Sequence, residues 1–445
     1  MGQIRSRSAR PVAQPMSRAD VHIVGAGLAG LSAALALSEA GVRVRIHEAS
    51  PFAGGRCRSF EDPILERRID NGGHVVMSSN TATFAYLAAI GATDRLDGIV
   101  PARFPFLDLA TGESWTIRPN AGPIPWWIMA AGRRVPGTRP ADYAEALQLY
   151  FAPAEARVAD RLDPNGPLYE ALWAPLAIAV LNTDPREGAA RPLATMLANS
   201  FGKGESACRP YLAANGLSDA FVDPALETLV KRGVEIETGR ALSSIEIERG
   251  QAVALDFADE RLMLRGGCVV LALPPYAVAR LLPGIVVPTE MSPIVNAHYR
   301  LEAPVDLPGG TRLLGLIGGT AQWLIATGDV LSVTVSAADA LVERPSEALA
   351  ALLWRDCAAA LGHPALPVPP SRVIKEKRAT LRLTPAQEMQ RPGAATATQN
   401  LYLAGDWTQT GLPPTIESAI RSGSIAANAV LQGHGDRPRA PLPLE

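Results

Sequence analysis

A strand, a glycine-rich turn, a helix and a second strand follow one another near the start of the chain, and this order most constrains the fold. Residues 21–24 are apolar, and the sequence GAGLAG follows at once over residues 25–30. Apolar and small residues then recur with helical spacing as far as Glu39, and residues 42–46 read as the next strand. Such a unit predicts an α/β domain built around a parallel sheet.

Each glycine of the turn has a physical task at a phosphate-binding site. Gly25 permits the tight turn, Gly27 lets the backbone approach a pyrophosphate, and Gly30 allows the helix to pack closely on the strand. Leu28 and Ala29 open the helix, where unpaired N–H groups and a partial positive charge attract phosphate oxygens. The turn therefore predicts a site for a dinucleotide.

Glu48 closes the second strand, 18 residues after the last glycine of the turn, and Ala49 follows it. Its carboxylate is placed to accept hydrogen bonds from a ribose hydroxyl, and its charge would repel the 2′-phosphate of NADP. This unit alone does not separate NAD from FAD, and two further segments favour FAD. In the first, Gly54 and Gly55 suit a second close approach of the backbone to the cofactor, with Arg56 near the phosphates.

The second segment lies close to the C-terminus. A short apolar strand ends in Gly405 and Asp406, and a helix predicted over residues 416–431 opens at Thr415 and Ile416. Prolines directly before the helix suit its first turn. A strand that ends in Gly-Asp, followed by a helix N-terminus, can hold the ribityl chain and the electron-rich N1–C2=O2 edge of a flavin.

Together with the sequence DNGGH over residues 70–74, these segments resemble the FAD-dependent amine oxidase and phytoene desaturase superfamily. Within it, the chain is most similar to the squalene-associated FAD-dependent desaturase family, the bacterial hydroxysqualene dehydroxylases of hopanoid synthesis. Residues 69–76 and 403–419 carry this closer likeness, and residues 421–423 extend it. In that family, glutamine usually stands where this chain has Gly73.

The resemblance implies a Rossmann-like, discontinuous FAD-binding domain with a second, α+β domain for a lipid substrate. Its expected segments are 20–90, 206–287 and 395–433 for the FAD-binding domain and 91–205 and 288–394 for the substrate domain, followed by a tail over 434–445. Residues 1–19 carry arginines, serines and prolines without an apolar run, so we expect either a disordered leader there or a native start at Met16. The resemblance also implies that the backbone of Leu242 meets the adenine. Gly72, Gly73 and His74 are expected beside the isoalloxazine ring.

The same resemblance implies that reduced FAD converts hydroxysqualene into squalene and water. Departure of an allylic hydroxyl leaves a delocalised cation that a hydride can quench, so the site needs an acid and a water-excluding pocket. His74 is the first candidate acid, although a structural hydrogen bond would also explain it. Glu417, in the first turn of the last helix, is the second candidate, and positioning of that helix is its other interpretation.

Three other functions share features with this interpretation. A phytoene or carotenoid-type desaturase has the same kind of lipid pocket and runs in the oxidising direction. An amine oxidase would enclose the amine with aromatic side chains, which make up only 5% of this chain. A non-catalytic prenyl-lipid carrier would not need Glu48, Arg56 or Asp406.

Composition excludes several classes of protein. The 42 basic and 44 acidic side chains leave a net charge of −2, which argues against a nucleic-acid partner. The four cysteines lie far apart and the histidines are scattered, so no metal site is expected. No apolar run approaches the roughly 20 residues of a membrane-spanning helix, and the chain is expected to be cytoplasmic.

One segment, residues 123–131, is unusual for a cytoplasmic protein. It contains Trp126 and Trp127 among apolar residues, and Arg133 and Arg134 follow shortly after it. Indoles and long cationic side chains are typical of a membrane interface, which favours peripheral contact with the inner face of the cytoplasmic membrane. An ordinary helix tucked into the substrate domain explains the same residues, and the sequence leaves both interpretations open.

Overall fold

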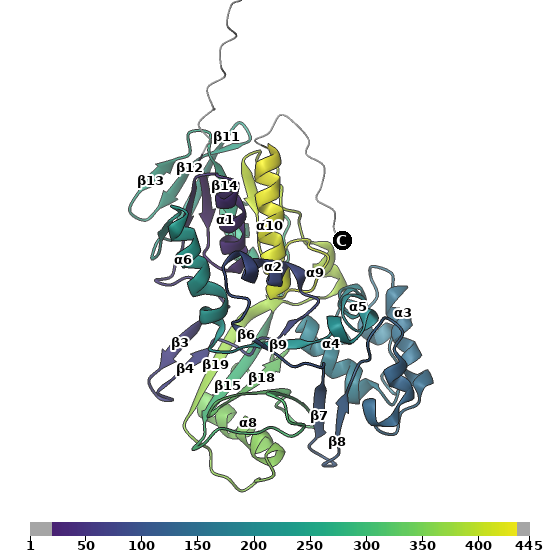
Figure 1. Cartoon of the computed structure of the whole chain (residues 1–445). Coiled ribbons are helices and arrows are strands. Elements are labelled where there is room, and N and C mark those ends of the chain that lie inside the picture. The colour runs from purple at the N-terminus through teal and green to yellow at the C-terminus, as the bar shows by residue number, and fades with distance from the viewer. Residues whose placement is uncertain (1–19, 434–445) are drawn as a thin grey trace, which may run out of the picture.

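The computed structural model describes residues 20–433, so the leader expected over 1–19 and the tail over 434–445 lie outside the described residues. A parallel sheet with the strand order β10-β2-β1-β14-β20 stands in the upper half of the molecule (Figure 1). Its strands are β1 (Val21–Val24), β2 (Val44–His47), β10 (Glu235–Glu237), β14 (Cys268–Leu271) and β20 (Leu401–Leu403). The chain thus brings strands from both ends of the sequence into one sheet.

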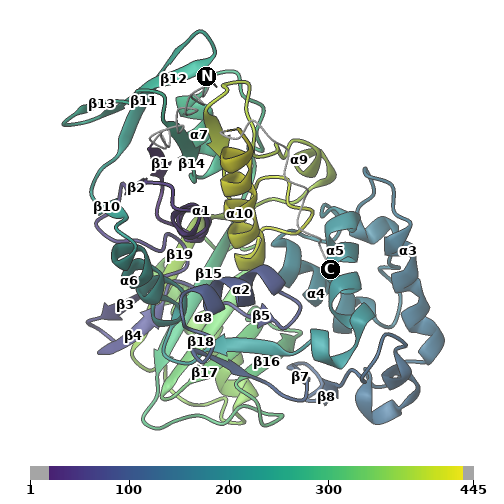
Figure 2. The ribbon, with the colours of Figure 1, turned by 45° about the horizontal axis from the view of Figure 1, so that its top comes forward.

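Helices and a small second sheet bury both faces of this parallel sheet. The inner strand β14 turns Val270 toward the core beneath α1 (Leu28–Glu39) and α10 (Ile416–Gly433), which lie side by side in Figure 2. It turns Val269 and Leu271 toward the opposite core. Burial on both faces explains why this strand reads as a continuous apolar run rather than as an alternation.

The opposite face is covered by an antiparallel sheet of three strands and by α7. The strands are β11 (Leu242–Glu248), β12 (Gln251–Phe257) and β13 (Arg261–Met263), and the helix is α7 (Pro275–Leu281). The other α-helices of the described chain are α2 (Thr81–Ala89), α3 (Leu147–Tyr150), α4 (Ala174–Leu181), α5 (Ala190–Asn199), α6 (Asp223–Lys231), α8 (Ser346–Ala360) and α9 (Pro385–Met389).

A seven-stranded sheet forms the second half of the molecule, in the order β19-β15-β18-β17-β16-β7-β8. Its strands are β7 (Phe104–Asp108), β8 (Ser114–Ile117), β15 (Met291–Arg300), β16 (Leu313–Ile317), β17 (Trp323–Thr327), β18 (Val330–Ser336) and β19 (Ser371–Leu381). The helix α8 packs on this sheet, and Trp354 lies 5.0 Å from Tyr299 between the ring centroids. Every strand of this sheet falls in the segments expected for the substrate domain.

Short strands join the two halves. β6 (Leu96–Gly98) and β5 (Val76–Met77) both pair with β9 (Pro210–Ala213), so β6 pairs with a segment that we expected in the other domain. A separate hairpin consists of β3 (Ser59–Asp62) and β4 (Arg67–Asp70). The boundary near residue 90 stays a prediction, because β6 sits between the two halves.

A lobe of short helices, which includes α3, α4 and α5, extends from the second half (Figure 1). The first turns of this lobe are the 3-10 helices η1 (Trp126–Met129) and η2 (Ala131–Arg133). The two neighbouring tryptophans of η1 differ in their exposure to solvent. Trp126 is 64% exposed, whereas Trp127 is 7% exposed and packs edge-on against Tyr143.

The expected membrane contact through Trp127 is therefore wrong, because successive residues of a short helix point in different directions and Trp127 belongs to the core of the lobe. Among residues 20–433, no helix is long and apolar enough to cross a bilayer. All four cysteines are buried.

The contact between α1 and α10 predicts a sensitive position. A Cβ at Gly423 would lie 2.1 Å from the carbonyl oxygen of Ala29, so Gly423→Ala has to push the helices apart. We expect the free energy of unfolding, measured by urea denaturation, to fall by about 1–3 kcal/mol or more. Gly393→Ala is the control, since a Cβ there meets nothing within 4 Å. Equal stability of the two variants would contradict the close packing.

Candidate cofactor and active site

The carboxyl ends of four parallel strands meet at one edge of the sheet. Val24 pairs with His47 on one side and with Leu271 on the other, and Leu271 pairs with Leu403. The residues that follow these strands, including Gly25, Glu48 and Gly405, therefore share this edge. Because neighbouring strands lie about 4.8 Å apart, Glu48 and Gly405 are separated by roughly 14 Å along it. This is the position where open α/β sheets bind an elongated ligand.

The glycine-rich turn leaves space for a ligand at one position and is closely packed at the other two. A Cβ on Gly25 would lie 2.4 Å from the carbonyl oxygen of Ala272, and one on Gly30 would lie 1.9 Å from the carbonyl oxygen of Gly25. A Cβ on Gly27 would meet nothing within 4 Å. No side chain caps the N-terminus of α1, so its first N–H groups face this open space beside Gly27 and are available to phosphate oxygens.

Glu48 lies across the turn from the start of α1. Its Oε2 accepts a hydrogen bond from the backbone N–H of Ala26 at 2.7 Å, and its Oε1 accepts one from Ser50 at 2.8 Å. These bonds fix the carboxylate at the edge of the sheet, with lone pairs left for a ribose hydroxyl. The segment before Leu242 runs beside it, because the N–H of Arg240 donates to the carbonyl oxygen of Glu48 at 2.7 Å.

The second pair of glycines lies against the first turn. Gly54 forms a parallel bridge with Gly27, and its N–H donates to the carbonyl oxygen of Ala26 at 2.8 Å. Gly54 and Gly55 both have positive φ angles, 102° and 58°, which an L-residue rarely adopts. The two glycine segments thus form one backbone surface, as a second approach to the same ligand requires.

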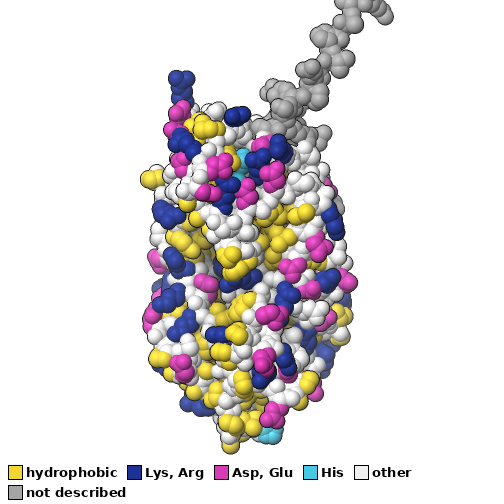
Figure 3. Space-filling model, turned by 90° about the vertical axis from the view of Figure 1, so that its left-hand side faces the viewer, with side chains coloured by type: hydrophobic (Ala, Val, Ile, Leu, Met, Phe, Trp, Pro, Cys, Tyr) yellow, Lys and Arg dark blue, Asp and Glu magenta, His cyan; other side chains and the backbone are white. Residues whose placement is uncertain are grey.

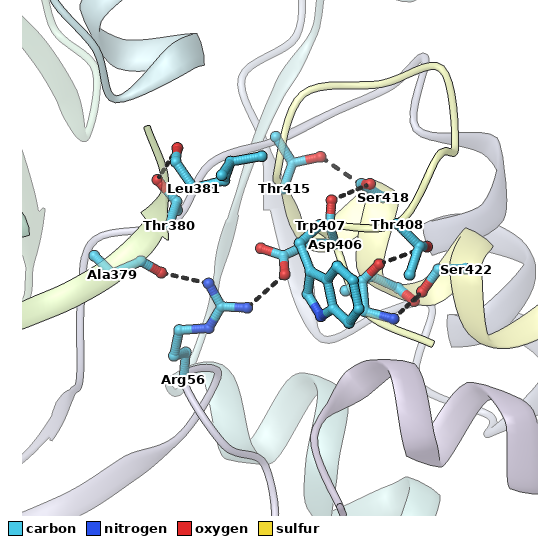
Figure 4. A network of polar contacts seen from close by, with 12 residues as sticks. Arg56, Ala379, Thr380, Leu381, Asp406, Trp407, Thr408, Thr415, Ser418 and Ser422 are labelled. Atoms are coloured by element: carbon cyan, nitrogen blue, oxygen red, sulfur yellow. Dashed lines mark hydrogen bonds and ion pairs between the residues drawn. The ribbon is translucent and has the colours of Figure 1, made fainter. Parts of the chain in front are cut away.

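Arg56 joins this surface to the C-terminal segment. Its guanidinium donates to Asp406 Oδ1 at 2.7 Å and also to the carbonyl oxygen of Ala379 on β19 (Figure 4). Asp406 is 5% exposed and Arg56 is partly exposed. We expected Arg56 near the phosphates, which stays a prediction; in the described structure its guanidinium forms an ion pair with Asp406, while the preceding Gly55 lies against Gly27 of the first turn.

The start of α10 is tied to the same aspartate through its backbone. Ser418 Oγ donates to the carbonyl oxygen of Asp406 at 3.1 Å, and Ser422 Oγ accepts from the N–H of Gly405 at 2.8 Å (Figure 4). The expected residues Thr415 and Ile416 stand directly before this anchored turn. The strand end and the helix N-terminus therefore form one unit, as the sequence predicted.

The DNGGH segment packs against the seven-stranded sheet. A Cβ on Gly73 would lie 2.7 Å from Thr334 Oγ1, and one on Gly72 would lie 3.2 Å from Asn296 Nδ2. His74 is partly buried. Loss of hydration, together with the nearby charge of Arg56, lowers the pKa of His74 to about 4. At pH 7 the ring is neutral, so it offers one N–H hydrogen bond and carries no additional proton.

Glu417 has contacts that fit a positioning role. It is 6% exposed, and its Oε2 accepts from the N–H and the Oγ1 of Thr83 at 2.8 and 2.7 Å. Its Oε1 accepts from the N–H of Ala82 at 3.0 Å. The carboxylate therefore caps the N-terminus of α2, not that of its own helix as we expected, because an acidic side chain stabilises whichever helix N-terminus it meets.

Sequence reasoning missed Arg391, which organises the loop after Asp406. This arginine is 5% exposed and donates to the backbone carbonyl oxygens of Asp406, Thr408 and Leu412 at 3.0, 2.7 and 2.8 Å. It also pairs with Glu388 at 2.8 Å. A single arginine before a proline carries no local pattern that would reveal these contacts.

Two histidines that look isolated in the sequence meet in the structure. His22 Nδ1 lies 3.1 Å from His47 Nε2, and His47 Nδ1 lies 2.9 Å from Glu237 Oε2. Burial, together with the neighbouring His47, lowers the pKa of His22 to about 4. Among residues 20–433, no three histidine, cysteine or acidic side chains are grouped as a metal site requires.

Comparison with known proteins adds to this geometry. Residues 28–431 match the family model described as flavin containing amine oxidoreductase. A hydroxysqualene dehydroxylase of Rhodopseudomonas palustris is 43% identical over 413 residues, covering 92% of this chain and 98% of the relative. A probable zeta-carotene desaturase of Synechococcus elongatus is 24% identical over 93% of this chain and 98% of its own length.

Solved structures show the same fold. A putative protoporphyrinogen oxidase from Exiguobacterium superposes with a TM-score of 0.67 at 17% identity, covering 94% of this chain and 99% of that protein.

The cofactor of this chain is FAD, and the residues at the sheet edge fit it. Gly27 leaves room for the pyrophosphate, Glu48 can receive the ribose, and Gly405 and Asp406 stand where the flavin end would lie.

Replacement of Glu48 tests this assignment. Glu48→Gln removes the charge that a ribose hydroxyl would bond to, and a hydrogen bond to a charged group contributes about 1.5–3 kcal/mol. We expect the affinity of the apoprotein for FAD, measured by quenching of flavin fluorescence, to fall about tenfold to a hundredfold. Glu39→Gln, at an exposed position of α1, serves as the control. Unchanged FAD binding by Glu48→Gln would remove Glu48 from the site.

Proposed function

The chain belongs to the hydroxysqualene dehydroxylase family of the flavin-containing amine oxidoreductases, and on that basis we propose that it reduces hydroxysqualene to squalene. Near full-length identity of 43% to a relative of that name is the observation that carries the proposal. The likeness to a carotene desaturase is much lower at 24%, which favours reductive removal of a hydroxyl over desaturation. The ion pair of Arg56 with Asp406 and the fixed carboxylate of Glu48 favour an enzyme over a lipid carrier.

Bound FAD, in its reduced form, supplies a hydride to the allylic carbon that loses the hydroxyl. The side chains of this protein have three tasks around that step. Glu48 and the open position at Gly27 bind the nucleotide end of the cofactor, while Asp406, held by Arg56, orients the flavin end. The face of the seven-stranded sheet against which Gly72 and Gly73 pack would exclude water, so that the cation is not captured as the alcohol again.

We assign His74 to the leaving hydroxyl as a neutral hydrogen-bond donor. Its segment packs against the seven-stranded sheet, and its electrostatic coupling to Arg56, the ion-pair partner of Asp406, supports a position near the flavin end. A neutral imidazole would stabilise the departing oxygen through one N–H without changing its own charge, and the proton that completes the water would come from the reduced cofactor, which gives up a proton together with the hydride. Glu417 is assigned to positioning, because three hydrogen bonds from the start of α2 occupy its oxygens.

The substrate is an isoprenoid of about 30 carbons, and burial of its chain is worth roughly 20 kcal/mol at ~0.8 kcal/mol per CH₂. Free substrate in water is thus vanishingly scarce, and the enzyme must take it from a membrane or a partner. We assign the membrane contact to the start of the helical lobe, where Ile124, Trp126 and Met129 are 56%, 64% and 62% exposed. Arg133 and Arg134 follow at once and are suited to headgroup depth.

A single-turnover experiment tests the reaction. Enzyme with photoreduced FAD, mixed anaerobically with hydroxysqualene in detergent, should produce squalene in amounts equal to the flavin that is reoxidised. Extraction with chromatography measures the product, and flavin absorbance measures the reoxidation. Lack of squalene, combined with desaturation of phytoene by the oxidised enzyme, would replace the proposal with a desaturase.

The role of His74 predicts both a rate and a pH profile. We expect His74→Ala to lower the single-turnover rate about a hundredfold, the cost of losing one donor to a developing oxyanion. His74→Gln, which keeps an N–H donor, should recover part of that loss, and the exposed His363→Ala should have no effect. Because the pKa of His74 is about 4, the wild-type rate should stay flat between pH 6 and 8.

A requirement for the imidazolium would give a different profile. Above the pKa of 4 the protonated fraction falls tenfold for each pH unit, so the rate would fall by the same factor from pH 6 to 8. Such a slope in the wild type that is absent in His74→Gln would contradict neutral donation.

A further inference from the structure

A cationic cavity opens beside the exposed start of the helical lobe, at the outer edge of the seven-stranded sheet. Its volume is about 340 Å³, which is within the usual range for small-molecule sites. Strands β7 and β8 form one wall, and the chain from η2 to Pro136 forms the other. Figures 1 and 2 show β7 and β8 next to the helical lobe. The cavity lies outside the edge of the parallel sheet where FAD is assigned.

The charge that lines this cavity is positive and uncompensated. Arg118 and Arg134 are the charged side chains of its lining, and no carboxylate lines it. Arg134 donates through Nε to the carbonyl oxygen of Thr138 at 2.9 Å and through Nη1 to that of Ile128 at 2.8 Å. These bonds hold the guanidinium in place without neutralising it. Arg118 is exposed, and no acidic partner for it occurs among residues 20–433.

An indole N–H adds an unsatisfied donor to the same lining. Trp115 is 9% exposed and lies stacked on Phe106, with ring centroids 5.7 Å apart. Its Nε1 is buried and has no hydrogen-bond partner in the described part of the chain. A buried donor without an acceptor costs about 1–3 kcal/mol, so a ligand that supplies an acceptor regains that free energy.

The surface next to this cavity, at η1, carries exposed apolar side chains. Only Ala130 separates η1, which carries the exposed Trp126 and Met129, from η2, which lines the cavity. On the opposite face, shown in Figure 3, basic and acidic side chains are interspersed. A cationic cavity that is lined by no carboxylate and lies directly beside exposed apolar side chains matches a molecule with an anionic head and an apolar tail.

We propose that this cavity binds the phosphodiester of an anionic phospholipid, with Arg118, Arg134 and the indole N–H of Trp115 as its donors and Trp126 and Met129 against the acyl region. The inference rests on the membrane contact proposed above and deepens it. It gives the enzyme a defined depth and orientation on the bilayer, instead of a diffuse attraction to its surface.

Soluble ligands separate a lipid headgroup from free phosphate. Short-chain phosphatidylglycerol, kept below its micelle concentration, should raise the unfolding temperature of the holoenzyme. Short-chain phosphatidylcholine and inorganic phosphate at equal concentration should not. A rise of equal size with inorganic phosphate would make the cavity a site for free phosphate and would overturn the lipid assignment.

Vesicle flotation with three variants tests the donors. Arg118→Gln should weaken binding to phosphatidylglycerol vesicles about fivefold, as expected for one cation at a membrane surface. Trp115→Phe keeps an aromatic ring and removes the indole N–H, so binding should weaken severalfold. Arg280→Gln, an exposed arginine on α7, is the charge-matched control and should bind as the wild type does.

The outcomes discriminate between mechanisms. If Trp115→Phe binds as tightly as the wild type while Arg118→Gln does not, the attraction is diffuse and the cavity site is wrong. Trp126→Ala should weaken binding to neutral and anionic vesicles alike. Arg118→Gln should retain wild-type turnover in detergent, so a failure of lipid binding and a failure of the proposed reaction are seen separately.

Discussion

The pairing of β20 beside β14 is the contact on which the rest of the structure depends. This parallel ladder brings residue 401 next to residue 269, and it delivers Asp406 to the edge where Gly25 and Glu48 already stand. Backbone hydrogen bonds set the register, so the positions of these side chains follow from strand geometry rather than from contacts among themselves. In the proposed site, Gly27 and Glu48 bind the nucleotide half of the cofactor, and the residues that would bind the flavin half follow β20.

Close helix packing secures that ladder. α10 follows β20 directly and lies on α1, where Gly423 meets the backbone of Ala29 and Ser32 Oγ donates to the carbonyl oxygen of Ile420 at 2.8 Å. The first helix of the chain and the last thus cover the same face of the parallel sheet. Because α1 also begins at the phosphate turn, the same contact fixes the turn and the flavin end relative to each other.

The sequence predicts the strands, turns and helices that carry the residues of this site. It does not predict which distant residues these elements contact. The glycine spacing, the run of residues 21–24 and the Gly-Asp pair each indicate an element and its end, since these patterns depend on neighbours in the chain. Glu417 shows the limit of prediction from the sequence alone. Its place in a first helical turn is visible in the sequence, but the helix that it caps lies more than 300 residues away.

Trp126, Trp127 and Arg391 show the same limit in other ways. The two tryptophans are neighbours in the sequence and nothing there distinguishes them. In the structure, Trp127 packs against Tyr143 and is buried, whereas Trp126 is exposed. Arg391 stands in no motif, because its acceptors are carbonyl oxygens that any residue can supply. A hydrogen bond to a backbone carbonyl does not depend on which residue supplies that carbonyl. The sequence therefore does not reveal positions such as Arg391, and only the folded structure shows their contacts.

The distribution of charge bears on the chemistry of a carbocation. Arg56 neutralises the charge of Asp406, hydrogen bonds from the start of α2 occupy the oxygens of Glu417, and His74 is neutral at pH 7. Near the flavin end these groups leave no free carboxylate to trap a cation as an ester and no imidazolium to repel it. The fate of the cation then depends on which nucleophile is nearest. A site that excludes water selects the hydride, and an apolar substrate drawn from a bilayer brings little water with it.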